Sequence, residues 1–390
     1  MDIGWGDLLC GMVRCMVPGG RDEIYAACSR HTNAPDRAAF FLSVRSGFDA
    51  VLQALGLPER SQVLVHAMTN PDMLEILKAH HLIAVPVDVD PLTLCPDLDS
   101  LEKGFGKDTV GILVTHLFGG RVAMDSIVLF AKKRGLLVFE DSAQGYWGDD
   151  FTGHPESAVC MFSFGPSKHN TALGGALFFV RDPELLRQVN QVQYSQPAQS
   201  RWQFFKRLIK YCIIAFLNRP GPYTILCAGC RLLCKSHDAF LYWATRGFPG
   251  PGLLGKIRKQ PSYPLLALML RRFKSDALSR TTRRRRVARA FCKRIPGACY
   301  PGHGEDRSYW LFPIRVSNPE ELCQRLWKAG FDAHLWPVSM CVVPAFGETR
   351  ELVPEQALAL RRELLFLPVY PEVGDQHLDR LAKLIRQFAG

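Results

Sequence analysis

The sequence predicts an α/β fold with a large, mostly parallel sheet and a second, smaller α/β domain toward the C-terminus. Between residues 40 and 195, short apolar runs alternate with amphipathic segments, which is the rhythm of βαβ units. A basic helical segment followed by a strand and further helices occupies the chain after about residue 275. With 390 residues, the chain is long enough for two domains with cores of their own.

The elements of the large domain follow from the apolar pattern. Strands are expected at 63–65, 83–87, 110–114, 136–139 and 176–180. Helices are expected at 47–55, 71–80, 123–134 and 183–193. For the smaller domain we expect a helix at 275–294, a strand at 309–316, a helix at 319–328 and an amphipathic helix ending at Phe388. The predicted domains are 1–199 (large), 200–270 (a hydrophobic and basic helical insertion) and 271–390 (small).

Two residues carry the first functional signal. Asp141 follows the expected strand 136–139, and ligands bind beyond the carboxyl ends of strands in open α/β sheets. Lys168 lies in a later loop. A carboxylate can keep a pyridine nitrogen protonated, and a lysine amine can form a Schiff base with an aldehyde. This pair of groups is what a pyridoxal 5'-phosphate (PLP) enzyme requires.

The block made of residues 140–144, Ser163, Lys168 and the glycines 174–175 resembles the DegT/DnrJ/EryC1/StrS family of PLP-dependent sugar aminotransferases. The resemblance covers most of residues 40–195 and returns weakly toward the C-terminus. It implies the aspartate-aminotransferase-like fold type I, PLP as the cofactor, and a homodimer, because active sites of this fold form at the subunit interface. The implied reaction moves an amino group from an amino acid, glutamate, to a nucleotide-linked keto-sugar in glycan or cell-surface polysaccharide biosynthesis.

The resemblance also assigns roles to individual residues. Lys168 would carry the cofactor and move protons between the substrate and the cofactor. Asp141 would pair with the pyridine nitrogen, and Gln144 would contact the phenolic oxygen of the ring. Ser163 matches a serine that hydrogen-bonds the cofactor phosphate.

Four further positions would complete the cofactor site. Ser46, Gly47 and Phe48 resemble the family's phosphate-binding turn, in which backbone amides at a helix start hold the phosphate. Asn70 falls where many family members place an aromatic residue that stacks on the ring. If Asn70 does not stack, His116 or Phe118 could take that place.

The chain departs from the family pattern at several positions. Phe48 replaces a threonine, Leu173 replaces the glutamate before the glycine pair, and no Asn-x-Arg loop of a partner subunit is recognisable near Ser262. Two alternatives therefore stay open: a PLP enzyme with another outcome, such as a dehydratase or a non-sugar aminotransferase, and a membrane-docked non-catalytic homologue. Related dehydratases have histidine in place of the lysine. His169 is only a neighbour of Lys168 here, so transamination is favoured.

Residues 200–270 differ in character from the rest of the chain. They combine aromatic, apolar and basic residues, and 220–222 is a Pro-Gly-Pro break. No run reaches the roughly 20 apolar residues of a spanning helix. A hairpin lying at a membrane interface through 204–234 is one interpretation, and a buried helical pair or a subunit contact is the other. The chain lacks a signal-peptide pattern and a disulfide-like cysteine spacing. These features predict a cytoplasmic protein, and the interfacial hairpin would make it peripheral on the cytoplasmic membrane face.

Two clusters of charged or ligand-type residues remain. The net charge of +11 predicts an anionic partner, and residues 283–286 are four consecutive arginines. They suit anionic lipid, a nucleotide diphosphate or a solvated helix face; without a recognition motif, we predict no nucleic-acid binding. Residues 227–237 carry possible zinc or iron–sulfur ligands, Cys227, Cys230, Cys234 and His237. On a helix these share one face and favour packing, so no metal site is predicted.

Overall fold

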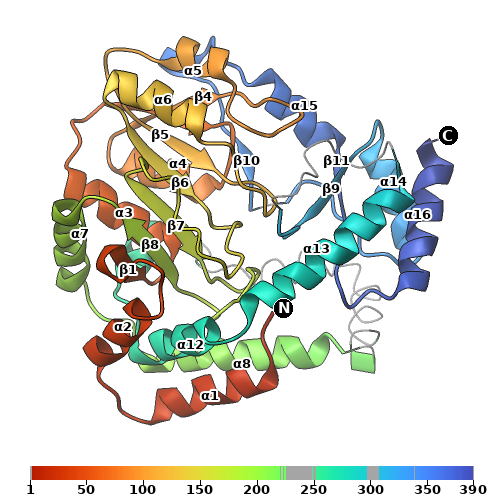
Figure 1. The fold of residues 1–390 in the computed structure, drawn as a ribbon, viewed down its shortest axis with the longest axis horizontal. Coiled ribbons are helices and arrows are strands. Elements are labelled where there is room, and N and C mark those ends of the chain that lie inside the picture. Colours follow the sequence, from red (N-terminus) through yellow and green to blue (C-terminus); the bar gives the residue numbers. More distant parts are fainter. Residues whose placement is uncertain are drawn as a thin grey trace. The chain divides into compact units, whose positions relative to one another are not determined.

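The computed structural model describes residues 2–219, 221, 222, 224, 248, 252–296, 307–337 and 339–389. It contains a seven-stranded sheet. The strand order is β1-β8-β7-β6-β5-β2-β4 (Figure 1). The strands are β1 (Ala38–Phe41), β2 (Gln62–His66), β4 (Ile83–Val87), β5 (Thr109–Thr115), β6 (Leu137–Asp141), β7 (Val159–Ser163) and β8 (Ala176–Val180).

The pairing within this sheet is mostly parallel. β2 pairs in parallel with β4 and β5, and β5 pairs in parallel with β6, whereas β1 pairs antiparallel with β8. Nearly every position of these strands is buried, as expected for strands covered on both faces. The five strands predicted for the large domain are confirmed, and the sheet also contains β1 and β7, which the sequence pattern did not predict.

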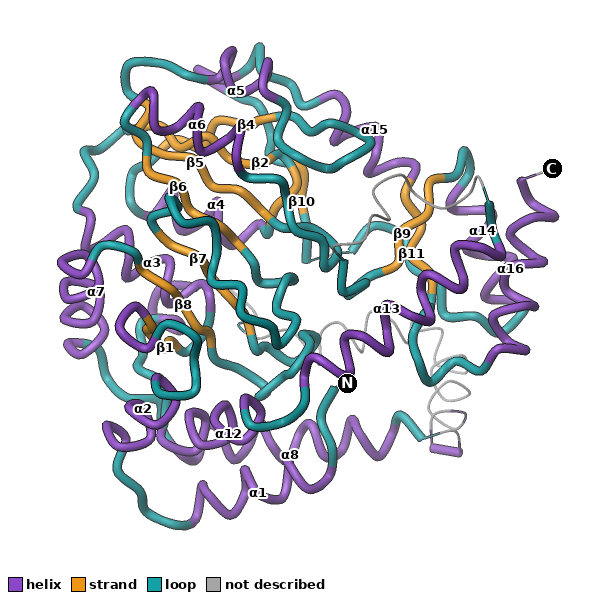
Figure 2. The backbone as a smooth tube through the Cα atoms, viewed as in Figure 1, coloured by secondary structure: helices purple, strands orange, loops and turns teal. Residues whose placement is uncertain are grey.

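The chain divides into two compact units, each described by itself. Unit 1 comprises residues 1–55, 150–152 and 161–277. Its helices are α1 (Trp5–Met16), α2 (Arg21–Ser29), α3 (Val44–Leu55), α7 (Pro183–Ser195), α8 (Arg201–Leu217), α11 (Leu253–Ile257) and α12 (Tyr263–Phe273), with the short 3-10 helix η1 (Pro35–Arg37). α12 is buried along its apolar run, and α1, α8 and α12 pack side by side (Figure 2).

Unit 2 comprises residues 56–149, 153–160 and 278–390. Its first part adds the helices α4 (Pro71–Ala79), α5 (Leu98–Gly104) and α6 (Asp125–Arg134) to the parallel strands. Its last part contains α13 (Ala277–Arg294), β9 (Phe312–Arg315), α14 (Pro319–Lys328), α15 (Glu355–Glu363), β11 (Leu364–Leu367) and α16 (Asp375–Ala389). The short strands β3 (Met68–Thr69) and β10 (Cys341–Val342) pair antiparallel, and η2 (Gly347–Thr349) is a 3-10 turn. These two units are groups of residues that contact one another, and they do not test the predicted domains. The predicted domain boundaries therefore stay a prediction.

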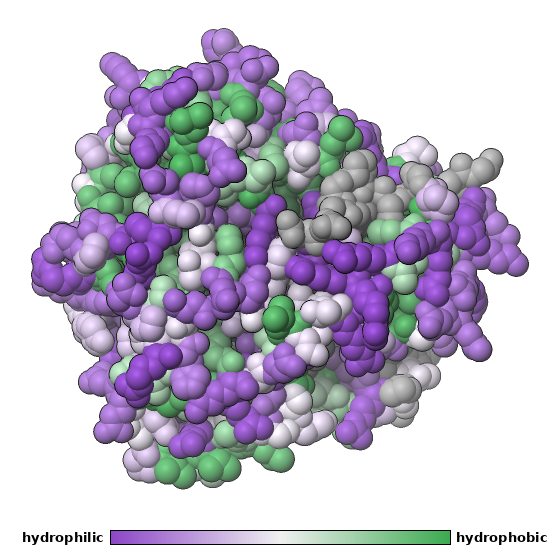
Figure 3. Space-filling view, in the orientation of Figure 1, coloured by the Kyte–Doolittle hydropathy of each residue, from purple (hydrophilic) through white to green (hydrophobic). Residues whose placement is uncertain are grey.

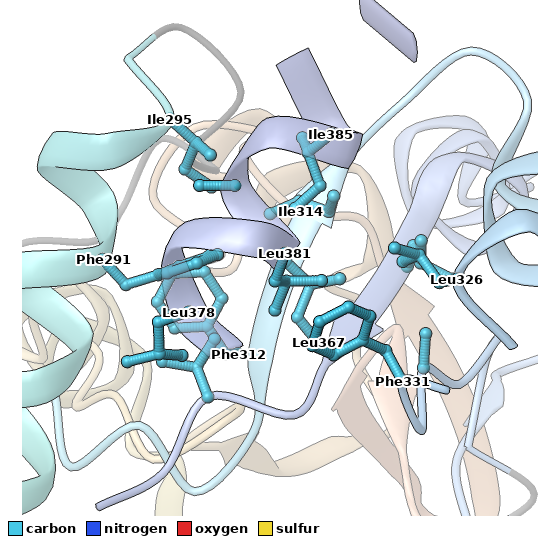
Figure 4. Close-up of a cluster of buried hydrophobic side chains, with 14 of the residues drawn as sticks. Phe291, Ile295, Phe312, Ile314, Leu326, Phe331, Leu367, Leu378, Leu381 and Ile385 are labelled. Carbon is cyan, nitrogen blue, oxygen red and sulfur yellow. The ribbon is translucent and has the colours of Figure 1, made fainter. Parts of the chain in front are cut away.

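The C-terminal part of unit 2 has its own apolar core. β9 and β11 form an antiparallel pair, and α13, α14 and α16 supply apolar side chains that pack with it. Figure 4 shows Phe291 of α13, Phe312 of β9 and Leu378 of α16 pointing toward one another. This arrangement agrees with the α/β elements predicted after residue 275.

The predicted interfacial segment 204–234 is described only in part. Its first half forms α8, whereas residues 225–234 lie outside the described residues, as do Cys227, Cys230, Cys234 and His237. Among the helices that the structure does describe, none combines the length and apolarity needed to cross a bilayer.

Candidate functional site

The carboxyl end of β6 places two of the predicted residues in one turn of unit 2. Asp141 ends the strand and is buried, and its Oδ1 accepts a hydrogen bond from the Ala143 N–H at 3.0 Å. Gln144 follows in the same turn, and its Oε1 accepts the Phe118 N–H at 2.7 Å. The turn therefore fixes the orientation of both side chains through backbone donors.

A buried histidine–glutamate pair next to this turn was not predicted. The Nε2 of His116 lies 2.9 Å from Oε2 of Glu140, and both side chains are fully buried. The Val122 N–H donates to His116 Nδ1 at 2.9 Å, so the proton of the ring sits on Nε2 and points at the carboxylate. Glu140 Oε1 also accepts the His154 N–H at 2.6 Å. The pair stabilises the strand end that carries Asp141, whose carbonyl accepts the His116 N–H at 3.0 Å.

The acidity of Glu140 reflects these donors. Burial alone would raise the pKa of its carboxyl, because a charged group loses hydration in the interior. The hydrogen bonds from His116 and from the His154 backbone outweigh burial and hold the pKa of Glu140 below its usual value. Glu140 is therefore a buried anion with its partners in place.

The residues suggested for ring stacking have other contacts. Phe118 is fully buried and packs edge-on against Phe366, with ring centroids 5.1 Å apart. His116 is equally buried between Glu140 and Val122, so neither ring offers a stacking surface. Asn70 caps α4, and its Oδ1 accepts the N–H two residues later at 2.9 Å. Its role toward a ring stays a prediction.

The loop after β7 brings Ser163 and Lys168 together in unit 1. The Gly165 N–H donates to Ser163 Oγ at 3.3 Å, and the Lys168 N–H donates to the Gly165 carbonyl at 3.0 Å. A Cβ on Gly165 would lie 3.4 Å from Ser163 Oγ and 3.9 Å from Lys168 Cγ. Lys168 itself is half-buried. The serine and the lysine thus sit on one tight turn.

The far end of this loop is held by α8. Leu173, at the family's glutamate position, is buried in a left-handed conformation with φ of 61°. Its carbonyl accepts a hydrogen bond from Arg207 Nη1 at 3.2 Å, and burial lowers the pKa of that guanidinium. A Cβ on Gly174 would lie 2.8 Å from the same nitrogen, so a larger residue there would make the guanidinium of Arg207 shift.

The helix α3 starts earlier than the sequence pattern predicted, and the phosphate-binding role of Ser46, Gly47 and Phe48 stays a prediction. The helix begins at Val44, three residues earlier than expected, so the Gly47 N–H already donates to the Ser43 carbonyl at 3.1 Å. The Ser46 N–H donates to Ser43 Oγ at 3.2 Å. The Gly47 amide is therefore not the orphan donor that the sequence pattern suggested. Phe48 is fully buried in the core.

Close packing gives Gly47 a structural role. A Cβ at this position would lie 2.4 Å from the Cζ atom of Phe178 in β8, so helix and strand approach as closely as only glycine allows.

The same helix carries a buried ion pair that was not predicted. Asp49 is fully buried, and Arg258 donates to its two oxygens at 2.9 and 3.0 Å. Gln53 donates to the same carboxylate at 2.6 Å. The hydrogen bond to Asp49 raises the pKa of Arg258. The bidentate geometry ties the segment after α11 to the first turns of α3.

The arginine-rich helix α13 is packed on one side and lines a cavity on another. Arg285 lies 4.1 Å from the ring centroid of Trp147, and its Nε donates to the Arg307 carbonyl at 2.9 Å. Arg121 lies 3.4 Å from the same ring. A cavity of about 500 Å³ is lined by Thr282, Arg285, Arg286, Arg289, Ala290 and Lys293. Figure 3 shows the hydrophilic surface over this helix.

Sequence comparisons connect the chain to known aminotransferases. Residues 36–212 match the DegT/DnrJ/EryC1/StrS aminotransferase family. The L-glutamine:2-deoxy-scyllo-inosose aminotransferase of Streptomyces paromomycinus is 36% identical over 145 residues, which cover 36% of this chain and 34% of that protein. The pleiotropic regulatory protein of Geobacillus stearothermophilus is 31% identical over 173 residues, covering 42% and 46%. The chain thus spans less than half the length of these curated relatives.

A longer alignment and the solved structures extend the likeness. The dTDP-4-dehydro-2,3,6-trideoxy-D-glucose 4-aminotransferase of Saccharopolyspora spinosa is 25% identical over 368 residues, covering 89% of this chain and 83% of that protein. A DegT DnrJ EryC1 StrS aminotransferase from Brucella abortus superposes with a TM-score of 0.72 at 17% identity, covering 99% and 96% of the two chains. NtdA from Bacillus subtilis superposes with a TM-score of 0.71 at 19% identity, covering 98% and 81%. The chain has the fold type I fold of PLP-dependent aminotransferases, and residues 36–212 match the DegT/DnrJ/EryC1/StrS aminotransferase family.

Proposed function

We propose that the protein is a PLP-dependent aminotransferase that moves an amino group from glutamate to a nucleotide-linked keto-sugar in glycan or polysaccharide biosynthesis. The observation that carries the proposal is the family match, because residues 36–212 contain Asp141, Gln144, Ser163 and Lys168 as one set. The names of two relatives agree with the substrate class: one is a UDP-2-acetamido-2-deoxy-3-oxo-D-glucuronate aminotransferase of Pseudomonas aeruginosa and one acts on a dTDP-linked sugar.

The described residues fit PLP chemically. Asp141 is a buried carboxylate oriented by the Ala143 N–H, as a partner of a pyridinium nitrogen must be. The amide oxygen of Gln144 is occupied by the Phe118 N–H, so its amide nitrogen is the group that would donate to the ring oxygen. Ser163 Oγ accepts the Gly165 N–H and would donate its own proton to the phosphate.

Lys168 would do the proton transfer. PLP, when bound, supplies an electron sink that stabilises negative charge at the substrate carbon. The Nζ of Lys168 would hold the cofactor until the amino donor displaces it. The freed amine would then move a proton from the α-carbon of the donor to C4′ of the cofactor, and in the half-reaction with the keto-sugar it would move a proton from C4′ to the sugar carbon. The short turn from Ser163 to Lys168 would keep the amine in place for both steps.

The basic cavity on α13 suits the nucleotide part of the substrate. Arg286, Arg289 and Lys293 line it together, and guanidinium and ammonium groups bind diphosphate oxygens well. We therefore assign the diphosphate of the nucleotide-linked sugar to these side chains. The proposed active form is a homodimer, by analogy with the fold type.

The absorbance spectrum of the purified protein with added PLP tests the proposal. A visible band that appears with PLP, shifts to shorter wavelength with glutamate and is absent in Lys168→Ala would support it. Lys133→Ala, which removes an exposed lysine of α6, is the matched control and should keep the band. A band that glutamate does not shift would indicate another donor or another PLP reaction, such as dehydration.

A second candidate is a non-catalytic homologue. Two observations favour it: the Gly47 amide is engaged within α3, and Leu173 replaces the family's glutamate. One relative is named as a pleiotropic regulatory protein rather than as an enzyme. The absence of any PLP band in the wild-type protein would decide for this candidate.

A further inference from the structure

Helix α8 is apolar on two opposite faces. One face is buried and contains Phe204, Leu208 and Tyr211. The other is exposed, and its large apolar residues recur at helical spacing as Trp202, Ile209, Ile213 and Phe216. A surface helix of a soluble domain normally turns polar residues to solvent, whereas a helix that is apolar all round normally has a partner on both sides. The exposed apolar stripe of α8 is therefore expected to bind a partner.

Helix α1 adds a second exposed stripe beside the first. Its large apolar residues at helical spacing are Trp5, Leu9, Val13 and Met16. The two helices run antiparallel in unit 1: Arg219 lies 5.9 Å from the ring centroid of Trp5, and Arg201 donates to the Val17 carbonyl at 3.4 Å. Figure 3 shows hydrophobic surface along the lower edge of the view, where α1 and α8 lie in Figure 1. We call these two stripes the α1–α8 face.

The charges around this face are of one sign. Residues 185–237 contain no aspartate or glutamate, and α8 and its end carry Arg201, Lys206, Lys210 and Arg219. Lys206 also lies 5.6 Å from the ring centroid of Trp202. The one carboxylate of α1, Asp7, is paired with Arg271 and Arg272 at 2.7 Å. An apolar stripe with a cationic rim is complementary to an anionic surface.

We infer that the α1–α8 face docks on an anionic lipid surface. Its apolar side chains would enter the boundary between headgroups and acyl chains, and the lysines and arginines would contact lipid phosphates. Trp5 and Trp202 belong to the residue type that is enriched at this depth of a bilayer. A second copy of the chain fits less well as the partner. A symmetric contact would bring the cations of the two α8 helices together, and α8 has no carboxylate that could neutralise them. The inference does not depend on the proposed enzymatic activity.

Vesicle binding tests this inference on the full chain. The wild-type protein should co-sediment with phosphatidylcholine vesicles that contain phosphatidylserine, less with phosphatidylcholine alone, and less in high salt. The double variant Ile213→Glu/Phe216→Glu should weaken vesicle affinity by about tenfold or more, because two carboxylates must then leave water or face anionic headgroups. Leu129→Glu on α6 is the matched control, since Leu129 and Ile213 are both 54% exposed, and it should bind like the wild type.

Further readouts make the outcome decisive. Quenching of tryptophan fluorescence by brominated acyl chains, reduced in Trp202→Phe and in Trp5→Phe, would place the α1–α8 face in the lipid. Failure of the wild-type protein to sediment with anionic vesicles at low salt would overturn the inference. So would a lipid-free dimer that the double variant converts to a monomer in sedimentation velocity, because the face would then join two copies. A circular dichroism spectrum like that of the wild type would show that the double variant folds, and unchanged PLP absorbance would show that the proposed function stands apart.

Discussion

Replacement of Glu140 by glutamine should destabilise the protein through a defect that the structure makes specific. The carboxylate accepts from His116 Nε2 at 2.9 Å and from the His154 N–H at 2.6 Å. A glutamine can keep one of these bonds with its oxygen, but its NH2 then meets the other donor. The imidazole cannot change its tautomer without leaving the Val122 N–H unpaired. The variant therefore buries one unsatisfied donor and loses a charged acceptor.

The expected cost is about 2–4 kcal/mol in the free energy of unfolding at neutral pH, from the typical cost of an unsatisfied buried donor and of a lost charge-assisted bond. Its pH dependence has a definite sign. The folded state holds the pKa of Glu140 below its unfolded value, so the unfolded chain binds more protons as acid is added. The difference between wild type and Glu140→Gln should be complete above about pH 5 and should shrink as the pH falls further, because glutamine does not titrate.

Denaturant titrations followed by circular dichroism at neutral and acid pH measure both effects. Glu156→Gln is the control, because Glu156 forms an exposed pair with Lys132 and should contribute less than about 1 kcal/mol. A loss below about 1 kcal/mol for Glu140→Gln at neutral pH, or a loss that stays constant into acid, would refute the reasoning about this pair.

Three further predictions follow from single contacts. Gly47→Ala should lower the free energy of unfolding by about 1–3 kcal/mol, measured by denaturant titration, because the new methyl group would overlap Phe178. Arg258→Ala should cost about 1–3 kcal/mol in the same assay, because it leaves the carboxylate of Asp49 buried without its cation; partial exposure of the arginine limits the loss. Arg289→Glu should raise the KM for a nucleotide-linked keto-sugar at least about tenfold and leave the PLP absorbance band unchanged.

Matched variants make these three predictions decisive. Gly255→Ala adds a methyl group where no heavy atom lies within 4 Å, so it should be close to neutral. Lys259→Ala removes a neighbouring cation but keeps the Arg258–Asp49 ion pair. If Lys259→Ala lowers the free energy of unfolding as much as Arg258→Ala does, the ion pair is not responsible for the loss. A KM that Arg289→Glu leaves unchanged would remove the cavity on α13 from substrate recognition.

The sequence predicts best those helices and strands whose ends are marked by nearby residues, such as a capping residue, a proline or a glycine. Helix 319–328 was placed correctly, because Asn318 caps it and a proline stands in its first turn. Strand 176–180 was likewise confirmed, because five apolar residues follow a pair of glycines. The start of α3 was placed too late, because Ser43 supplies the hydroxyl and carbonyl that accept the first amides and its role is only visible in three dimensions.

Contacts between strands were harder to predict. β1 has only four residues, and its antiparallel partner β8 lies far along the chain. No local sequence pattern therefore predicts this strand. The His116–Glu140 pair arises because β5 and β6 are neighbours whose carboxyl ends coincide, with Thr115 opposite Asp141. A signal was present, since His116 stands two residues after the predicted strand 110–114, but local sequence does not reveal the order of the strands in the sheet.

Helix α8 joins two properties of the protein that would otherwise be separate. On one side, Arg207 holds the Leu173 carbonyl at the end of the lysine loop; on the other, the α1–α8 face is open to solvent. Thermodynamic linkage makes any coupling through such an element reciprocal. If lipid contact changes the affinity for the cofactor by some factor, cofactor must change the affinity for lipid by the same factor. Cofactor binding at the lysine loop would then change lipid binding through α8, and lipid binding would change cofactor binding.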